Sequence, residues 1–355
     1  MGRVGLACFA LGAALLGITT SGASAALSIT GVGSFTLPAG GTGAAELSGI
    51  AWAGGTQYYA VADSGAGLYP LSISINSTTG AITSATQSAK IQLLAGTDLE
   101  GVVYDAPTNS VYVSDETGPA IRKYAISTGA VSSTVTVPAI YNNIAPNFSL
   151  ESLSRGGSNL WTSNEEALTV DGLPSSTSAG SWVRLQRFDA AFAPAGQWAY
   201  RTDPISADSP FFSVERSGVS DLLALPDGRL LVLERELGGS ILVDYRNRIY
   251  LVDLTGATDT SAITSLNSAT FTGATKTLLW QGDFANDNFE GITLGPQLAN
   301  GDYSIILVSD DGGGTNAQSL YALRIAGVPE PGGMALLGAA SLLLTRRSRK
   351  ARCSD

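Results

Sequence analysis

One short pattern recurs five times along this 355-residue chain and constrains its fold more than any other feature. Each copy has the order polar, apolar, polar, small or acidic, apolar. The copies occupy residues 46–50, 98–102, 149–153, 218–222 and 288–292. Successive copies begin 51 to 70 residues apart, a spacing that suits a four-stranded blade with loops of variable length. The chain is therefore expected to form a ring of equivalent units.

An acid ends the second strand-like segment of every unit, 14 to 20 residues after the third residue of the pattern. These acids are Asp63, Asp115, Glu165, Glu234 and Asp310. A third segment closes each unit, at 68–71, 122–126, 184–188, 248–251 and 320–324. Short segments rich in Val, Ile, Tyr and Leu alternate with turn residues throughout, and helical periodicity is hard to find. We predict an all-β fold, a β-propeller with five visible repeats and five or six blades.

The remaining segments decide how the ring is completed. The strand-like segment 27–37 is expected to complete the last blade, because such closure hides the edges of the sheet. A sixth, irregular blade would have to lie in 190–215 or 255–285. A β-sandwich is the alternative fold, but it does not explain why acids return at matched positions.

The chain contains no histidine, and its two cysteines, Cys8 and Cys353, lie close to its ends. The lack of histidine excludes Ser-His-Asp and Cys-His nucleophilic systems as well as His-ligated zinc. The 30 Asp and Glu outnumber the 20 Lys and Arg, and the terminal segments hold six of the basic residues. This acidity argues against a nucleic-acid ligand, which needs a basic surface, and favours cations as partners.

In a propeller, equivalent blade positions face the same end of the central channel, so the recurring acids should converge on one site. Like charges that are held together raise each other's pKa or require a cation. Carboxylate oxygens without His or Cys suit a hard ion, so Ca²⁺ is the expected cofactor. The expected metal ligands are Glu100, Asp115, Glu151, Glu165, Glu234, Glu290 and Asp310. The alternative is that each acid is a turn residue bonded to local N–H groups.

Four basic residues are candidates for contacting a substrate phosphate, because a guanidinium offers a planar pair of donors to phosphate oxygens. Each of them can instead neutralise a neighbouring acid. We predict Glu151, Glu290 and Arg235 as catalytic residues, and Lys123, Arg155 and Arg216 as substrate-binding residues.

Several of these segments together resemble the phytase-like family described by its esterase-like activity of phytase. The matching segments are 98–101, 114–116, 150–153, 163–165, 220–225, 231–235, 287–291 and 308–310. The resemblance implies a propeller shared with calcium-dependent phytases, and phosphoester hydrolysis at an acid-rich metal centre. In two departures from the family pattern, Ser152 stands where Gly is usual, and three glycines follow Asp311 in place of an Asn-rich continuation.

The two ends of the chain carry export signals. Residues 1–25 combine Arg3, an apolar run at 4–18 and small residues at 23–25, which is typical of a cleavable signal peptide. At the other end, Pro329-Glu330-Pro331, an apolar run at 332–345 and a basic cluster resemble a PEP-CTERM segment that an exosortase recognises and cuts. An ordinary tail anchor is the alternative, although this run is shorter than the roughly 20 residues that cross a bilayer comfortably. The expected parts are a signal peptide (1–25), a phytase-like propeller domain (26–326) and a sorting or anchor segment (327–355).

These features predict an exported protein of the periplasm, cell surface or extracellular matrix, with transient or retained membrane association through its C-terminal segment. Signal peptidase and exosortase are the expected processing partners, and a phosphoester or an exopolysaccharide is the expected ligand. The predicted function is a surface-associated, calcium-dependent phosphoesterase. A non-catalytic matrix or adhesion propeller with structural calcium is the main alternative, and the lack of histidine counts against a third, a carboxylesterase.

Overall fold

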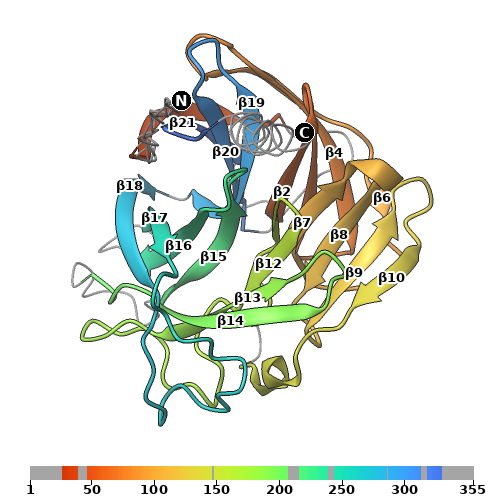
Figure 1. Cartoon of the computed structure of the whole chain (residues 1–355). Coiled ribbons are helices and arrows are strands. Elements are labelled where there is room, and N and C mark those ends of the chain that lie inside the picture. Colours follow the sequence, from red (N-terminus) through yellow and green to blue (C-terminus); the bar gives the residue numbers. More distant parts are fainter. Residues whose placement is uncertain are drawn as a thin grey trace, which may run out of the picture.

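The computed structural model describes residues 26–38, 46–145, 148–206, 216–238, 244–285, 287–312 and 318–329. These residues form five antiparallel sheets arranged around a central axis, as Figure 1 shows. The fold is a five-bladed β-propeller, which confirms the fold class expected from the repeat. Among the described residues, no helix is long and apolar enough to span a bilayer.

Each blade has four strands that follow one another outward from the axis. Blade 1 contains β2 (Leu47–Gly54), β3 (Gln57–Ala62), β4 (Gly67–Ile75) and β5 (Ile82–Gln87), and β6 (Ile91–Gln92) also pairs with β4. Blade 2 contains β7 (Leu99–Asp105), β8 (Ser110–Asp115), β9 (Ala120–Ala125) and β10 (Val131–Val135). Blade 3 contains β11 (Ser154–Gly156), β12 (Asn159–Ser163), β13 (Trp182–Phe188) and β14 (Pro194–Arg201). Blade 4 contains β15 (Arg216–Ala224), β16 (Leu230–Gly238), β17 (Asp244–Asp253) and β18 (Thr275–Ala285). Blade 5 contains β19 (Asn288–Gln297), β20 (Tyr303–Asp310), β21 (Ser319–Ala326) and β1 (Ser28–Thr36).

The innermost strands close a ring around the axis. β2 contacts β7, β7 contacts β11, β11 contacts β15, β15 contacts β19, and β19 contacts β2. The ring is fastened at its outer side by β1, which pairs with β21 from Ser28 opposite Ala326 to Thr36 opposite Ser319. The strand from the start of the chain therefore completes the blade from its end, as the sequence predicted.

The repeated pattern occupies equivalent places in all five blades. Its second, apolar residue is fully buried in every unit, and these residues are Leu47, Leu99, Leu150, Val219 and Phe289. No sixth sheet exists in the described part of the chain. The segments considered for it supply β14 and β18, the outermost strands of blades 3 and 4.

A β-bulge follows this apolar residue on four of the inner strands. The pairing register shifts after Leu47, Leu99, Val219 and Phe289. A bulge adds a residue to one strand and re-aims its side chains, so the third residue of the pattern leaves the ordinary alternation of a strand. The third residue can therefore turn toward the axis while its apolar neighbour stays in the core.

The fourth residue of the pattern lies where neighbouring inner strands approach most closely. A Cβ added to Gly49 would lie 2.1 Å from the backbone oxygen of Glu100, and one added to Gly101 would lie 2.2 Å from Leu153 N. Ser152 fills this position in blade 3, fully buried, and its hydroxyl bonds that of Ser163 at 2.7 Å. Glycine is therefore needed here in blades 1 and 2, whereas blade 3 accommodates a small hydroxyl.

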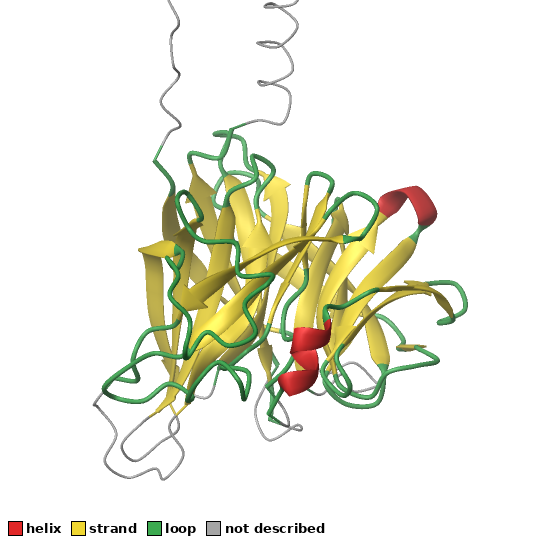
Figure 2. Ribbon diagram, turned by 60° about the horizontal axis from the view of Figure 1, so that its bottom comes forward, coloured by secondary structure: helices red, strands yellow, loops and turns green. Residues whose placement is uncertain are grey.

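The channel has two different ends because all inner strands run in the same direction. The short helices η1 (Ala106–Thr108) and η2 (Ala139–Asn143) lie at opposite ends of the propeller in Figure 2. η2 precedes an inner strand, whereas η1 follows one. Both ends of the described chain lie on the side of η1, since β1 begins and β21 finishes where the inner strands end. The expected signal peptide at 1–25 and most of the expected sorting segment lie outside the described residues.

Candidate metal centre

Three glutamates occupy the third position of the pattern: Glu100 in blade 2, Glu151 in blade 3 and Glu290 in blade 5. Glu100 and Glu151 are buried, with 4% and 7% of their surface exposed. The charge of Glu151 is repelled by those of both Glu100 and Glu290. The structure thus brings the three carboxylates into one electrostatic cluster where the inner strands begin. We call this the acidic end of the channel.

Blade 2 supplies the tightest group of carboxylates at the acidic end. One carboxylate oxygen from each of Asp98, Glu100 and Glu116 lies within 4.8 Å of the others. Neighbouring polar groups hold them in place, because the Ser48 hydroxyl donates to Glu100 and the Ser149 N–H donates to Glu116 at 2.6 Å. Three acids from one short stretch therefore share a space that a single cation could occupy.

Glu151 stands beside this group with no partner. Its carboxylate makes no hydrogen bond or ion pair among the described residues, although the residue is more than nine-tenths buried. Burial, followed by repulsion from Glu100 and Glu165, raises the pKa of Glu151 well above its ordinary value. A buried carboxylate without a donor is costly unless it is protonated or binds a cation.

Other acids at this end show the same effect. Burial raises the pKa of Glu116 to about 8, and repulsion from Asp98 and Glu165 adds to the increase. Burial raises the pKa of Glu290 to about 7, although the nearby charge of Arg235 opposes this shift. Near neutral pH the acidic end is therefore an incompletely ionised cluster that gains from any added positive charge.

Arg235 on β16 is the positive charge that the protein places in this cluster. Its guanidinium donates to Glu165 and, through Nη1, to Asn288 Oδ1 at 3.1 Å. The same Nη1 lies 3.4 Å from Glu290 Oε1. Arg235 therefore neutralises the blade 3 and blade 5 side of the acidic end.

Arg216 flanks the same end in a more exposed position. Its Nη1 lies 3.2 Å from Glu166 Oε1, and its guanidinium stacks over the Phe148 ring at 4.1 Å. Its side chain keeps 42% of its surface exposed, so it remains available to an anionic ligand at the rim.

Asp310, at the end of β20, combines a turn role with membership of the cluster. It accepts hydrogen bonds from Gly312 N at 2.8 Å and from Asn288 Nδ2 at 3.2 Å. Its charge also repels that of Glu290. Asp310 is therefore both a turn residue and a member of the acidic end.

Two of the expected ligands are already paired with basic residues. Asp115, the last residue of β8, forms an ion pair with Arg122 on the next strand. Glu234 lies within β16, where its buried carboxylate accepts from the Tyr200 hydroxyl and pairs with Lys276. Both acids already have a local cation, so they do not add free charge to the acidic end.

Two of the expected phosphate contacts lie near the opposite end of the channel. Lys123 Nζ and Arg155 Nη1 bind the two oxygens of Asp105, at 2.7 and 2.9 Å. Asp105 ends the inner strand β7, five residues after Glu100 and at the opposite end of that strand. These two basic residues therefore cannot serve the same site as Arg235.

Asp98 and Glu116, which complete the tightest group of carboxylates, were not among the residues expected from the sequence. Asp98 begins the pattern of blade 2 and Glu116 directly follows Asp115. Because Asp115 is the last residue of β8, the next residue leaves the strand and turns in another direction. The Asp115-Glu116 doublet could have indicated an additional acid at the site. Only the end of β8 shows which of these two acids faces the axis.

The donor atoms at the acidic end fit a hard cation. All candidate ligands are carboxylate oxygens, and the chain has no histidine to offer. Ca²⁺ accepts six to eight oxygen ligands in flexible geometry. The unpartnered Glu151 beside Asp98, Glu100 and Glu116 provides the excess negative charge that such an ion would compensate.

The fold and this cluster define the molecule as a five-bladed propeller with an acid-lined channel. The family model for Phytase-like proteins, described as "Esterase-like activity of phytase", matches residues 42–313. The chain belongs to this family. The match covers all five inner strands and the whole acidic end.

Comparison with curated proteins and solved structures adds only distant structural matches. No curated protein matches the sequence. Among solved structures, the hydrazine synthase of Kuenenia stuttgartiensis is 10% identical with a TM-score of 0.33, over 73% of this chain and 55% of that one. A streptogramin B lyase is 10% identical with a TM-score of 0.35, over 84% and 98%. The PQQ-bound aldose sugar dehydrogenase of Streptomyces coelicolor is 13% identical with a TM-score of 0.41, also over 84% and 98%. These values are too low to inform the function.

Proposed function

We propose that this protein is an exported, surface-associated, calcium-dependent phosphoesterase whose ion is held at the acidic end of the channel. The single observation that carries the proposal is the unpartnered, buried carboxylate of Glu151 next to the group formed by Asp98, Glu100 and Glu116. Membership of the phytase-like family supports phosphoester hydrolysis as the chemistry.

Asp98, Glu100, Glu116 and Glu151 are the residues that would hold the ion. A bound divalent cation supplies polarisation of a phosphoryl oxygen and a lower pKa for bound water. The hydroxyl of Ser48 and the N–H of Ser149 orient two of these carboxylates before any ligand arrives. The site is therefore preorganised by its own neighbours.

Arg235 and Glu290 have the chemistry to act on the substrate. Arg235 is fixed by Glu165 and Asn288, so its guanidinium can contact a phosphate oxygen without losing its position. Glu290 has a pKa of about 7, which allows it to take a proton from water or return one near neutral pH. Arg216 at the rim is suited to guide an anionic substrate toward this end.

Export is proposed from the sequence of the two ends. The described chain leaves the propeller at residue 329 on the side opposite the acidic end. An anchor that follows this residue would leave the acidic end facing away from the membrane. A substrate outside the cell could then approach the site freely.

Thermal melting and hydrolysis of a phosphomonoester such as p-nitrophenyl phosphate test the proposal, each with calcium and with a chelator. Calcium should raise the melting temperature, because a ligand that binds only the native state adds RT ln(1 + [L]/Kd), about 2.7 kcal/mol at a hundredfold excess over Kd. Hydrolysis should require calcium and be lost in Glu151→Gln, which removes one charge with little change of shape. The exposed Asp253 at the end of β17 supplies the control, and Asp253→Asn should keep both effects.

The outcomes separate the proposed functions. Calcium-dependent stability without hydrolysis of this or related phosphomonoesters would favour the matrix propeller with structural calcium. Absence of both effects would refute a metal centre at the acidic end.

A further inference from the structure

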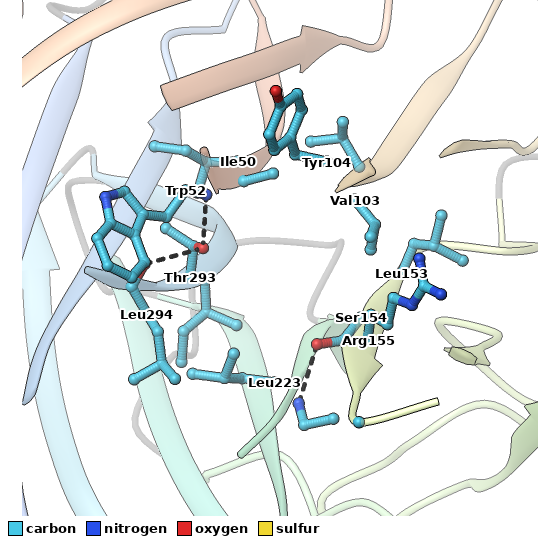
Figure 3. A pocket seen from close by; sticks show the side chains of 15 residues that line it. Ile50, Trp52, Val103, Tyr104, Leu153, Ser154, Arg155, Leu223, Thr293 and Leu294 are labelled. Atoms are coloured by element: carbon cyan, nitrogen blue, oxygen red, sulfur yellow. Dashed lines mark hydrogen bonds between the residues drawn. The ribbon is translucent and has the colours of Figure 1, made fainter. Parts of the chain in front are cut away.

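A cavity of about 280 Å³ lies at the other end of the channel, where the inner strands end. All five blades contribute to its wall, through β2, β7, β11, β15 and β19. Figure 3 shows the labelled side chains around the hollow, with Trp52 on one side and Arg155 on the opposite side. Neither the family match nor the acidic end assigns a role to this pocket.

Hydroxyl groups hold the walls of the pocket at fixed distances. Thr293 of blade 5 accepts a hydrogen bond from Trp52 N of blade 1 at 3.1 Å. Ser154 of blade 3 accepts one from Ala224 N of blade 4 at 2.9 Å. These bridges, drawn in Figure 3, satisfy edge N–H groups that would otherwise face the channel. The pocket is therefore formed before a ligand binds, as small-molecule sites usually are.

Among the described residues that line the pocket, Arg155 is the one charged residue, and none carries a carboxylate. Among the described residues, Arg155 has a single hydrogen-bond acceptor, Asp105, which it shares with Lys123. Two cations thus share one carboxylate, which leaves one net positive charge. The Arg155 side chain is 31% exposed, so its remaining N–H groups can reach a ligand. This rim is cationic in a protein that is otherwise strongly acidic.

More of the pocket's exposed surface is polar than apolar, so an apolar body can pack against only part of the wall. Ile50, Val103 and Leu223 form aliphatic surface inside the pocket. Trp52 and Tyr104 have their polar atoms engaged elsewhere, because Trp52 Nε1 donates to Gly55 O at 3.0 Å and the Tyr104 hydroxyl donates to Asn109 Oδ1 at 3.1 Å. These two aromatic residues therefore offer hydrocarbon surface to a ligand rather than hydrogen bonds.

We propose that this pocket binds a small organic monoanion, with its carboxylate on Arg155 and a ring-sized apolar body between the inner strands. One net positive charge matches a carboxylate better than a phosphate dianion, whose second charge would meet Asp105. The volume is just below the usual range for ligand pockets, about 300–1,000 Å³, which limits the body to about the size of one ring. The lining begins one residue after Gly49 on β2 and one residue after Gly101 on β7, on the side away from the acidic end.

Isothermal titration calorimetry of the full-length protein with benzoate, benzyl alcohol and phenyl phosphate tests this site. Benzoate should bind the unaltered protein more tightly than either of the other two probes. Arg155→Gln should weaken benzoate binding about tenfold or more, because it removes a charge-assisted hydrogen bond, and should leave benzyl alcohol unchanged. Trp52→Leu should weaken benzoate and benzyl alcohol alike, because it removes part of the apolar wall.

Arg324→Gln is the matched control. Arg324 also pairs with one aspartate, Asp302, at 3.2 Å, but it does not line the pocket. Its substitution should leave benzoate binding unchanged. The proposal is overturned if benzoate does not bind at millimolar concentration, if phenyl phosphate binds more tightly, or if Arg155→Gln and Arg324→Gln bind benzoate equally.

Discussion

Arg235 of blade 4 donates a hydrogen bond to the carboxylate of Glu165 in blade 3, and this contact divides the acidic end into two halves. On the side of Glu165 and Glu290, the guanidinium compensates the negative charge. On the side of Glu100 and Glu116, no described Lys or Arg forms an ion pair. The uncompensated half is therefore the proposed metal site.

Substituting Arg235 by Met should destabilise the protein strongly. The change leaves the buried Glu165 without its counter-charge, and breaking a buried pair costs about 3–5 kcal/mol. Arg324→Met, which removes an exposed ion pair, should cost about 1 kcal/mol or less. Urea unfolding of both variants in the presence of a chelator measures the difference. Equal loss in the two variants would mean that Arg235 does not compensate the cluster.

The metal-free protein should lose stability as the pH rises from about 4.5 to 8. Glu116 and Glu290 have folded-state pKa values of about 8 and 7, above the ordinary value of 4.5. Across this range the native state binds more protons than the unfolded state, so the free energy of unfolding falls with pH. Calcium should reverse the trend, because it replaces those protons. Melting temperatures at pH 5, 6, 7 and 8, with chelator and with calcium, provide the measurement. A chelated protein that becomes more stable toward pH 8 would contradict the inferred clustering.

Adding a methyl group at Gly101 should disturb the ring of inner strands. The new Cβ would lie 2.2 Å from Leu153 N, so the backbone of two blades must shift. Overpacking of this kind costs about 1–3 kcal/mol or more. Gly238→Ala is the control, because an added Cβ there meets no atom within 4 Å. A thermal scan that shows similar melting temperatures for the two variants would refute the close approach.

Asp221→Asn should weaken the joint between blades 4 and 5. The buried carboxylate of Asp221 accepts from Leu222 N and from Ile292 N, each at 2.8 Å. An amide has one acceptor oxygen, so one N–H loses its partner at a cost of about 1–3 kcal/mol. Asp253→Asn at an exposed turn should change the free energy of unfolding by less than about 0.5 kcal/mol. Hydrogen exchange at the Ile292 amide would show whether the bond was lost, and unchanged protection there would disprove this role.

The propeller and its closure could be predicted because both leave a periodic trace in the sequence, whereas five and six blades both remained open until the structure. The recurring apolar residue, exemplified by Leu99 and Phe289, marks the same buried position in each blade. The β1 segment could be assigned to the last blade because that blade otherwise lacks an outer strand. The repeated sequence pattern therefore determines the order of the strands and blades.

The composition of the site could be predicted only in part. The third-position acids Glu100, Glu151 and Glu290 were identified, since their recurrence is visible. The choice of Asp115 over Glu116, and the inclusion of Glu234, depended on where a strand ends and which neighbour supplies a cation. Arg122 and Lys276 lie on adjacent strands and capture Asp115 and Glu234, and a linear pattern cannot show such pairing across strands.

Calcium titration by calorimetry, after removal of metal ions with a chelator, tests the central claim most directly. The unaltered protein should bind calcium with a measurable heat of binding, and Glu151→Gln should weaken this binding about tenfold or more by removing one buried anionic ligand. Asp253→Asn should bind like the unaltered protein. Absence of calcium binding, or identical affinity in Glu151→Gln and the unaltered protein, would contradict a metal centre at the acidic end.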